Sequence, residues 1–304
     1  MLRDAILSTL AYYDVLDMPL TAEEVFRFLI KKDAVVPSLQ DVHRELEHKK
    51  QIGEREGFYY LFDREYLVPL RKEHERLAQR KWRIARRAGW WMRMVPFVRV
   101  VFASGSLSMN NTDELSDLDI IVVAKHGYIW MTRFLLHGLL MLLGKGRRHK
   151  DRVAPDKICP NHFITDASLG IPFHNMYTAQ LYVHLVPLIA VDYDDLKKFR
   201  MANAWVLDYT SRWDMPEDKI VRQGLSFAIQ LAGEMVLSIF GTIIERMAAR
   251  YQKLRIERNA TPLKPGGHLT YSDEALAFHA QSSSAEILAK YDKNLLFLST
   301  RGMV

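Results

Sequence analysis

The sequence of 304 residues contains a single cysteine, Cys159. One thiol excludes an internal disulfide framework and a thiolate cluster for zinc or iron and sulfur, and no histidines stand at the spacing of a zinc site. Near the N-terminus, Asp4 and Asp14 interrupt the apolar stretch that a signal peptide needs. These absences favour a reducing compartment, and we expect a cytoplasmic protein.

Long hydrophobic runs are scarce as well. The apolar segment 129–143 is short and holds Arg133, and the longer segment 225–244 contains Gln230 and Glu234. Such side chains are costly within lipid, whereas a buried helix of a bundle accommodates them at lower cost. We therefore expect a buried helix at 225–244 and no membrane partner.

The composition is otherwise that of an ordinary folded protein. Lys and Arg total 42 against 36 Asp and Glu, which gives a mildly basic formal charge of +6. The hydrophobic share of 49% is too high for wholesale disorder. The length suggests roughly two domains, each large enough to bury a core.

The first part of the chain carries the start signals of short helices. Helical periodicity over residues 2–16 is followed by two capping-box patterns, which begin at Thr21 and Ser38. The segment 52–62 is typical of a hairpin. Three helices and a hairpin resemble a winged helix, so we expect a winged-helix-like domain at 1–64.

A long basic helix is predicted to connect this domain to the next, over residues 65–95. Nine Lys or Arg fall between positions 71 and 94. Its basic face could lie along RNA or an acidic protein, but packing of its tryptophans on the next domain is the favoured interpretation. The face comprises Arg76, Arg80, Lys81, Arg83, Arg86 and Arg87, with Trp82, Trp90 and Trp91 interleaved.

From residue 96 onward, β-branched and aromatic runs alternate with a helical segment at 128–143. Three strands follow this pattern, at 97–103, 118–124 and 158–165. Beyond residue 171 the pattern is helical to the end of the chain. We therefore expect an α/β (α+β) core with a mixed sheet at 96–190 and a C-terminal helical bundle at 191–304.

The chemically informative residues are Gly105 and Ser106 and, after a spacer, Asp117 and Asp119. A strand that ends in Gly-Ser and leads into a helix brings backbone amides and a hydroxyl close to a phosphate. Two aspartates separated by one residue on a strand place both carboxylates on one face, where they can share a cation. Hard oxygen ligands beside a triphosphate imply Mg²⁺ or Mn²⁺.

This arrangement resembles the signature of the nucleotidyltransferase superfamily, the polymerase-beta-like fold, in which Gly-Ser precedes Asp-x-Asp by a spacer of about this length. The resemblance covers residues 96–165 and implies transfer of a nucleoside monophosphate from a nucleoside triphosphate to an acceptor hydroxyl, with release of pyrophosphate. It also implies that Gly105 and Ser106 bind the nucleotide and that Asp117 and Asp119 are catalytic and hold the metal.

The superfamily usually adds a third carboxylate from a later strand, and this sequence departs from that pattern. The strand predicted at 158–165 offers Asn161 and His162 instead, and Asp156 and Asp166 flank it. One of these aspartates could reach the metal, or His162 could act as a general base near neutral pH. Equally, the site could bind nucleotide without efficient turnover.

Other residues allow two interpretations each. Arg133 could face the phosphates or extend along the surface, and Cys159 is most simply a core strand residue. A basic run could grip a triphosphate or form a solvated loop; it comprises Lys145, Arg147, Arg148, Lys150 and Arg152. A second basic stretch could flank the acceptor site or form a charged helix face; it comprises Arg246, Arg250, Lys253, Arg255 and Arg258. Five C-terminal side chains are predicted to be core, namely Trp205, Tyr209, Met235, Phe240 and Met247.

We expect an enzyme, a metal-dependent nucleotidyltransferase with a nucleoside triphosphate as donor and a small molecule, an RNA or a protein as acceptor. The alternative is a weak or inactive nucleotide-sensing regulator that binds nucleic acid or a protein through the winged helix or the connector. Nucleic-acid binding is weakly supported. The helix predicted from residue 38 to 50 balances three Lys or Arg against three acids, and Glu54 and Glu56 in the hairpin oppose a phosphate backbone.

Overall fold

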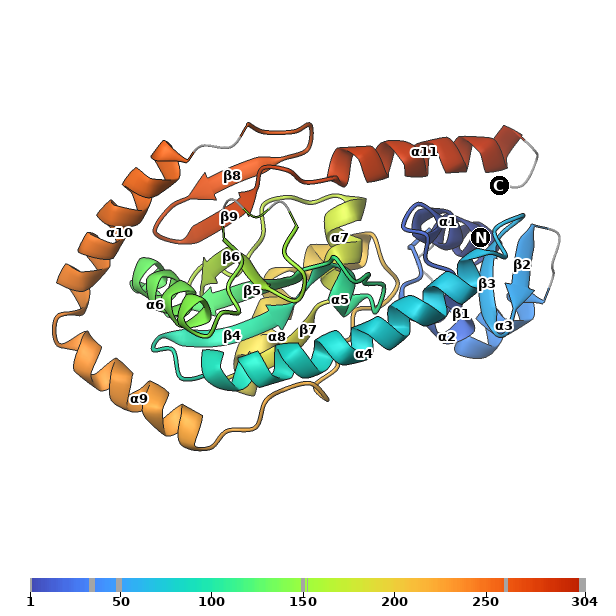
Figure 1. The fold of residues 1–304 in the computed structure, drawn as a ribbon. Coiled ribbons are helices and arrows are strands. Elements are labelled where there is room, and N and C mark those ends of the chain that lie inside the picture. The colour runs from blue at the N-terminus through green and yellow to red at the C-terminus, as the bar shows by residue number, and fades with distance from the viewer. Residues whose placement is uncertain are drawn as a thin grey trace.

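A six-stranded mixed sheet forms the centre of the molecule (Figure 1). The computed structural model describes residues 2–32, 36–47, 51–148, 151, 153–259 and 262–300. The strand order is β7-β4-β5-β6-β9-β8, in which β5 and β6 are parallel and the other neighbours antiparallel. The strands are β4 (Val98–Ala103), β5 (Leu118–Ala124), β6 (Ile158–Thr165), β7 (Val186–Ala190), β8 (His268–Tyr271) and β9 (Ala275–His279). The predicted α/β class with a mixed sheet is confirmed.

The N-terminal unit contains the three short helices and the hairpin that the sequence predicts. Thr21 and Ser38 each accept a hydrogen bond in a complete capping box, which fixes the starts of two helices. Glu56 and Gly57 turn the hairpin with positive φ angles of 55° and 80°. The elements are α1 (Leu2–Asp14), β1 (Leu20–Thr21), α2 (Ala22–Arg27), α3 (Leu39–Leu46), β2 (Ile52–Arg55) and β3 (Phe58–Leu61). Lys49 and Lys50, which enter the predicted charge balance, lie outside the described residues.

The connector is a single helix, α4 (Leu67–Met92), which runs from the N-terminal unit along the sheet (Figure 1). Lys81 and Trp82 on its predicted basic face are buried against the core, where the Trp82 indole donates to Asn110. Trp90 and Trp91 are each more than a third exposed. Five cations of the face are exposed, namely Arg76, Arg80, Arg83, Arg86 and Arg87. Packing through a tryptophan is therefore confirmed for Trp82 and is only partial for the other two.

The remaining helices cover the sheet and wrap one end of it. A strap formed by α9 (Leu225–Ser238) and α10 (Gly241–Arg258) lies at the outer edge of the molecule (Figure 1). The C-terminal helix α11 (Ser284–Thr300) returns to α1, where Tyr291 and Tyr12 meet edge to face at 5.5 Å. The others are α5 (Gly105–Ser108), α6 (Ile129–Leu142), α7 (Met176–Val183), α8 (Tyr193–Ala202) and a 3-10 helix, η1 (Ala204–Asp208).

The prediction of a helical chain beyond residue 171 is wrong in two regions. β7 is a strand within this segment, and β8 and β9 form a hairpin whose second strand pairs with β6. Five apolar residues such as those of β7 fit a buried strand as well as a helix turn, so periodicity cannot separate the two. The C-terminal segment is therefore not a helical bundle, because part of it completes the central sheet.

Each face of the sheet has its own hydrophobic core. Ile120 and Val122 of β5 face the cluster that includes α4 and α6, whereas Ile121 and Val123 face the cluster that includes α7 and α8. The second of these clusters continues into the N-terminal unit, with Ile6 of α1 among its members. The N-terminal unit and the sheet therefore share one core.

The expectation of a buried helix at 225–244 is wrong. Met235, Phe240 and Met247, which the sequence assigns to the core, are each more than 60% exposed. Trp205 and Tyr209 do pack against the core. Among the described residues, no single helix is both long enough and apolar enough to cross a membrane; α9 and α10 meet that test only as a pair, and they are bent by 93°.

Candidate metal and nucleotide site

The two predicted aspartates lie together where β5 begins. Leu118 and Ile120 point into the core, so alternation along the strand turns Asp117 and Asp119 to the opposite face. Cys159, the register partner of Asp119 on β6, joins them. Among the described residues, these three form the one group of metal-ligating side chains, with ligand atoms within 4.8 Å of one another.

The predicted phosphate loop touches this group directly. Gly105 has a φ of +66°, and a Cβ at this position would lie 2.9 Å from Oδ2 of Asp119. The backbone N–H of Ser104 donates to the carbonyl oxygen of Asp119 at 3.0 Å, which ties the loop to the strand. Ser106 follows as a half-buried residue. The structure thus brings all four predicted site residues to one place, although α5 is only four residues long.

Asp119 is the strongly perturbed carboxyl of the site. Burial and the neighbouring Asp117 carboxylate raise the pKa of Asp119 to about 7, against the opposing influence of Arg147. Its Oδ1 accepts a hydrogen bond of 2.8 Å from the side-chain amide of Asn161. Near neutral pH a cation therefore competes with a proton for this carboxyl.

The other carboxylate of the site, that of Asp117, pairs with Arg147. Its guanidinium donates to Oδ2 of Asp117, and a second nitrogen donates to the backbone oxygen of Asp151 at 3.2 Å. The backbone N–H of Arg147 bonds to Ile158 at the start of β6, so the chain after α6 is held beside the site. Of the predicted basic run, Arg147 is the residue that contacts the site, and Lys150 and Arg152 lie outside the described residues.

The candidates for a third carboxylate point elsewhere. Asp156 pairs with Lys81 at 3.0 Å, and Asp166 accepts from the backbone N–H of His126 at 2.7 Å. His162 is buried beside His279, and burial lowers its pKa to about 3, so its ring is neutral at physiological pH. The residue that contacts Asp119 from β6 is Asn161, an amide, as described above.

Arg133 takes neither of the positions that the sequence suggests. It is held inside the protein, where its guanidinium lies over the ring of Phe278 and donates to Gln252 of α10. Burial lowers its pKa to about 10. Arg133 therefore joins α6 to the strap. Within the described part of the chain, it makes no contact with Asp117 or Asp119.

Sequence reasoning missed two residues of the site. Cys159 was assigned to the core, yet it is half-buried beside both carboxylates, and burial followed by those charges raises the pKa of its thiol. Tyr177 of α7 is the second: burial and then the charge of Asp119 raise the pKa of its hydroxyl. No local motif marks either residue, because their places depend on the pairing of β5 with β6 and on the packing of α7.

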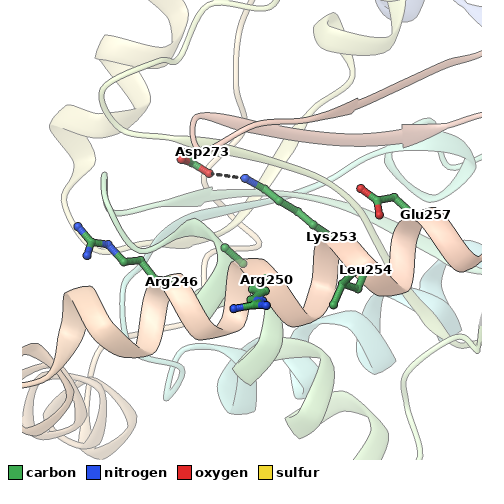
Figure 2. A pocket seen from close by; sticks show the side chains of 7 residues that line it. Arg246, Arg250, Lys253, Leu254, Glu257 and Asp273 are labelled. Atoms are coloured by element: carbon green, nitrogen blue, oxygen red, sulfur yellow. Dashed lines mark hydrogen bonds and ion pairs between the residues drawn. The ribbon is translucent and has the colours of Figure 1, made fainter.

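Two surface depressions differ in their relation to this group. The smaller, about 190 Å³, includes Asp117 and Arg147 in its lining. The larger, about 400 Å³, lies on α10, where Lys253 pairs with Asp273 at 3.3 Å (Figure 2). The smaller depression is the better candidate for the site, because Asp117 lines it. The charges of the larger depression lie on α10, at the far end of the sheet from α5 (Figure 1).

Comparisons with known proteins identify no relative of this chain. No family model, no curated protein and no solved structure matches the chain.

Proposed function

We propose that this protein is a metal-dependent nucleotidyltransferase with a polymerase-beta-like core. The observation that carries the proposal is the contact between the Gly105 loop and the Asp117 and Asp119 pair. A phosphate-binding loop beside two carboxylates is the arrangement that transfer of a nucleotidyl group requires. The N-terminal unit, with its three helices and hairpin, is proposed to be a winged helix.

The donor atoms suit a hard divalent cation. Asp117 and Asp119 would hold Mg²⁺ or Mn²⁺, because carboxylate oxygens are the ligands that these ions prefer. When bound, the metal supplies charge that stabilises the phosphates and activates the acceptor oxygen. Burial and the charge of Asp117 raise the pKa of Asp119, so a bound metal would have a proton to displace from this carboxyl. Arg147 pairs with Asp117 and would lie beside a triphosphate bound at the Gly105 loop.

In the proposed reaction an acceptor hydroxyl oxygen forms a bond to the α-phosphorus of the triphosphate. The bond from that phosphorus to the oxygen that bridges toward the β-phosphorus breaks, the hydroxyl proton passes to solvent, and pyrophosphate leaves. Gly105 and Ser106 would bind the triphosphate through backbone amides and the Ser106 hydroxyl. The absence of a Cβ at Gly105 lets the loop approach Asp119.

A second candidate function is a nucleotide-sensing regulator with little or no turnover. The contact of Asn161 with Asp119 favours it, because an amide in place of a third carboxylate brings no negative charge to the metals. Such a protein would bind nucleotide and engage nucleic acid or a protein partner through the N-terminal unit or the exposed arginines of α4. Salt-sensitive binding to RNA or duplex DNA that survives loss of both aspartates would support this candidate.

Calorimetric titration with ATP, GTP, CTP and UTP, with and without Mg²⁺, tests the proposed site. We expect metal-dependent binding of at least one nucleotide, weakened at least about tenfold in Asp117→Asn and in Asp119→Asn, because each substitution removes one charged ligand. Asp208→Asn, at an exposed acid on η1, is the matched control. Unchanged binding in both site variants would refute the metal site. Binding without pyrophosphate release in an acceptor screen would favour the regulator.

A further inference from the structure

The helices of the strap bury polar or small residues and expose several large apolar ones. In α9 the buried residues are Ser226 and Gln230, and in α10 they are Gly241 and Gln252. A surface helix normally turns its apolar face to the protein and its polar face to water. Here the fully buried positions are polar or small, and the apolar side chains of α10 that pack against the core are Ala248, Ala249 and Ile256, while the larger ones of both helices lie mostly outside.

The inward polar side chains bind backbone groups at the start of β4 and at the start of α6. Gln230 donates to Val98 at 2.7 Å, and the Glu234 carboxylate accepts from the N–H of Phe97 at 2.8 Å. On α10, the Glu245 carboxylate accepts from the N–H of Trp130 at 2.8 Å. Gln252 donates to the carbonyl oxygen of the same tryptophan at 2.7 Å. These bonds attach the strap to β4 and to the start of α6.

The outer face carries an apolar patch at the bend between the helices. We call it the elbow patch, and each of its six members is between 61% and 72% exposed: Met235, Val236, Ile239, Phe240, Ile243 and Met247. At 100° per residue, the members on each helix lie on the side opposite the buried glutamines. Large apolar patches on a surface mark sites that bind a partner or a membrane.

Cations border the apolar stripe of α10 that continues from the elbow patch. Arg246 and Arg250 lie on one side of the stripe formed by Ile243, Met247 and Leu254, as the spacing of an α-helix requires. Both arginines line the depression that also contains the ion pair of Lys253 with Asp273 (Figure 2). Arg255 and Arg258 lie on the other side of the apolar stripe. Glu257 is the one exposed acid on the described face of α10.

We infer that the outer face of α9 and α10 is a membrane-binding surface, which lays the protein on a bilayer that contains anionic lipid. Apolar residues at the elbow would enter the acyl boundary, while the flanking arginines would meet lipid phosphates. A second copy of the chain fits less well. Two such faces would oppose their arginines with one exposed acid each, and the convex bend of two helices offers little area to its own copy.

The surface would lie on the membrane and not cross it. The two helices are bent by 93°, and polar anchors on the inner face hold α9 at the start of β4 and α10 on α6. The strap binds the start of β4, whereas Gly105 follows the end of that strand. The candidate nucleotide site therefore faces away from the bilayer, so the inference stands whether or not the site turns over nucleotide.

Vesicle flotation tests the inference on the full chain. We expect the protein to float with vesicles of equimolar phosphatidylcholine and phosphatidylglycerol, and to float much less with phosphatidylcholine alone. The double substitution Ile239→Ser with Phe240→Ser should reduce binding at least about tenfold, because it removes two exposed apolar side chains from the patch. Arg246→Gln with Arg250→Gln should also reduce it and should weaken its dependence on salt. Met201→Ser, a 77% exposed residue of α8, is the control.

Circular dichroism and light scattering complete the test. Since the substituted side chains are exposed, all variants should keep the wild-type melting curve and remain readable. Equal flotation of wild type and the elbow variant would overturn the inference. A wild-type dimer that becomes monomeric in the elbow variant, without flotation of either, would assign the face to a second copy and also overturn it.

Discussion

Gly105 sets how closely the loop that is proposed to bind phosphate can approach Asp119. A Cβ would meet Oδ2 of Asp119 at 2.9 Å, and the φ of +66° disfavours any side chain. We expect Gly105→Ala to lower the free energy of unfolding by more than about 1 kcal/mol and to abolish metal-dependent nucleotide binding. Urea unfolding and calorimetric titration measure the two effects.

Gly127 provides the matched control for that substitution. It has a φ of +77°, and a Cβ there would meet nothing within 4 Å. Gly127→Ala should therefore cost about 1 kcal/mol from backbone strain alone and leave nucleotide binding intact. If Gly105→Ala binds nucleotide as the wild type does, the loop does not serve the site.

At the level of single residues, the sequence predicts what a local motif encodes. That Gly105, Asp117 and Asp119 lie together could be predicted, because strand alternation and the spacing of the motif act over a few positions. Cys159 and Arg147 could not be assigned, because their places depend on parallel pairing of β5 with β6 and on the return of the chain after α6.

Among the elements, α4 supports the aspartate strand through one buried cation. Lys81 is fully buried and donates to the carbonyl oxygen of Ser116 at 2.6 Å, and it pairs with Asp156 at 3.0 Å. We expect Lys81→Met to lower the free energy of unfolding by about 2 to 4 kcal/mol, because it leaves a buried acceptor and a partly buried carboxylate without their donor. Chemical denaturation followed by circular dichroism measures the loss.

Arg83, exposed on the same helix, is the control for Lys81. Arg83→Met should change stability by no more than about 0.5 kcal/mol. Equal losses in the two variants would contradict a supporting role for Lys81. A stability loss in Lys81→Met that leaves nucleotide affinity unchanged would restrict that role to folding.

Secondary structure was predictable where the signals are local. Capping boxes at Thr21 and Ser38 fix α2 and α3, and the β-branched runs fix β4 and β5. The hairpin of β8 and β9 was missed because its partner, β6, is far away in the sequence. The one buried helix predicted at 225–244 is correct only in part: the period is helical, but α9 ends at Ser238, the chain bends by 93° into α10, and the apolar face is turned outward.

Across the whole molecule, the junction between the N-terminal unit and the sheet is sensitive to acid. Nε2 of His184 lies 2.7 Å from the hydroxyl of Tyr13 in α1, and that hydroxyl donates to Gln180 at 2.7 Å. Burial, followed by Arg27 and Arg71, lowers the pKa of His184 to about 3. The imidazole is therefore neutral in the folded protein at a pH at which the unfolded chain binds a proton.

This linkage predicts the direction of a pH effect. The stability that neutral His184 contributes is complete above the unfolded pKa of about 6.5 and is lost as the pH falls toward 3. Between pH 7 and pH 5, His184→Gln should lose about 2 kcal/mol less free energy of unfolding than the wild type. His43→Gln, at an exposed position of α3, is the control and should follow the wild type. Parallel pH profiles for wild type and His184→Gln would contradict the prediction.

The late pairing of β6 has a consequence for synthesis on the ribosome. Between the end of β6 at Thr165 and the start of β9 at Ala275 lie roughly 110 residues, which a ribosome takes roughly 5 to 20 s to add. During that interval the outer edge of β6 has no partner strand, and open edges recruit strands from other chains. A nascent or truncated chain that stops before Ala275 would contain Gly105, Asp117 and Asp119 and yet be prone to aggregate. The last strands to emerge thus protect the strand that bears Asn161.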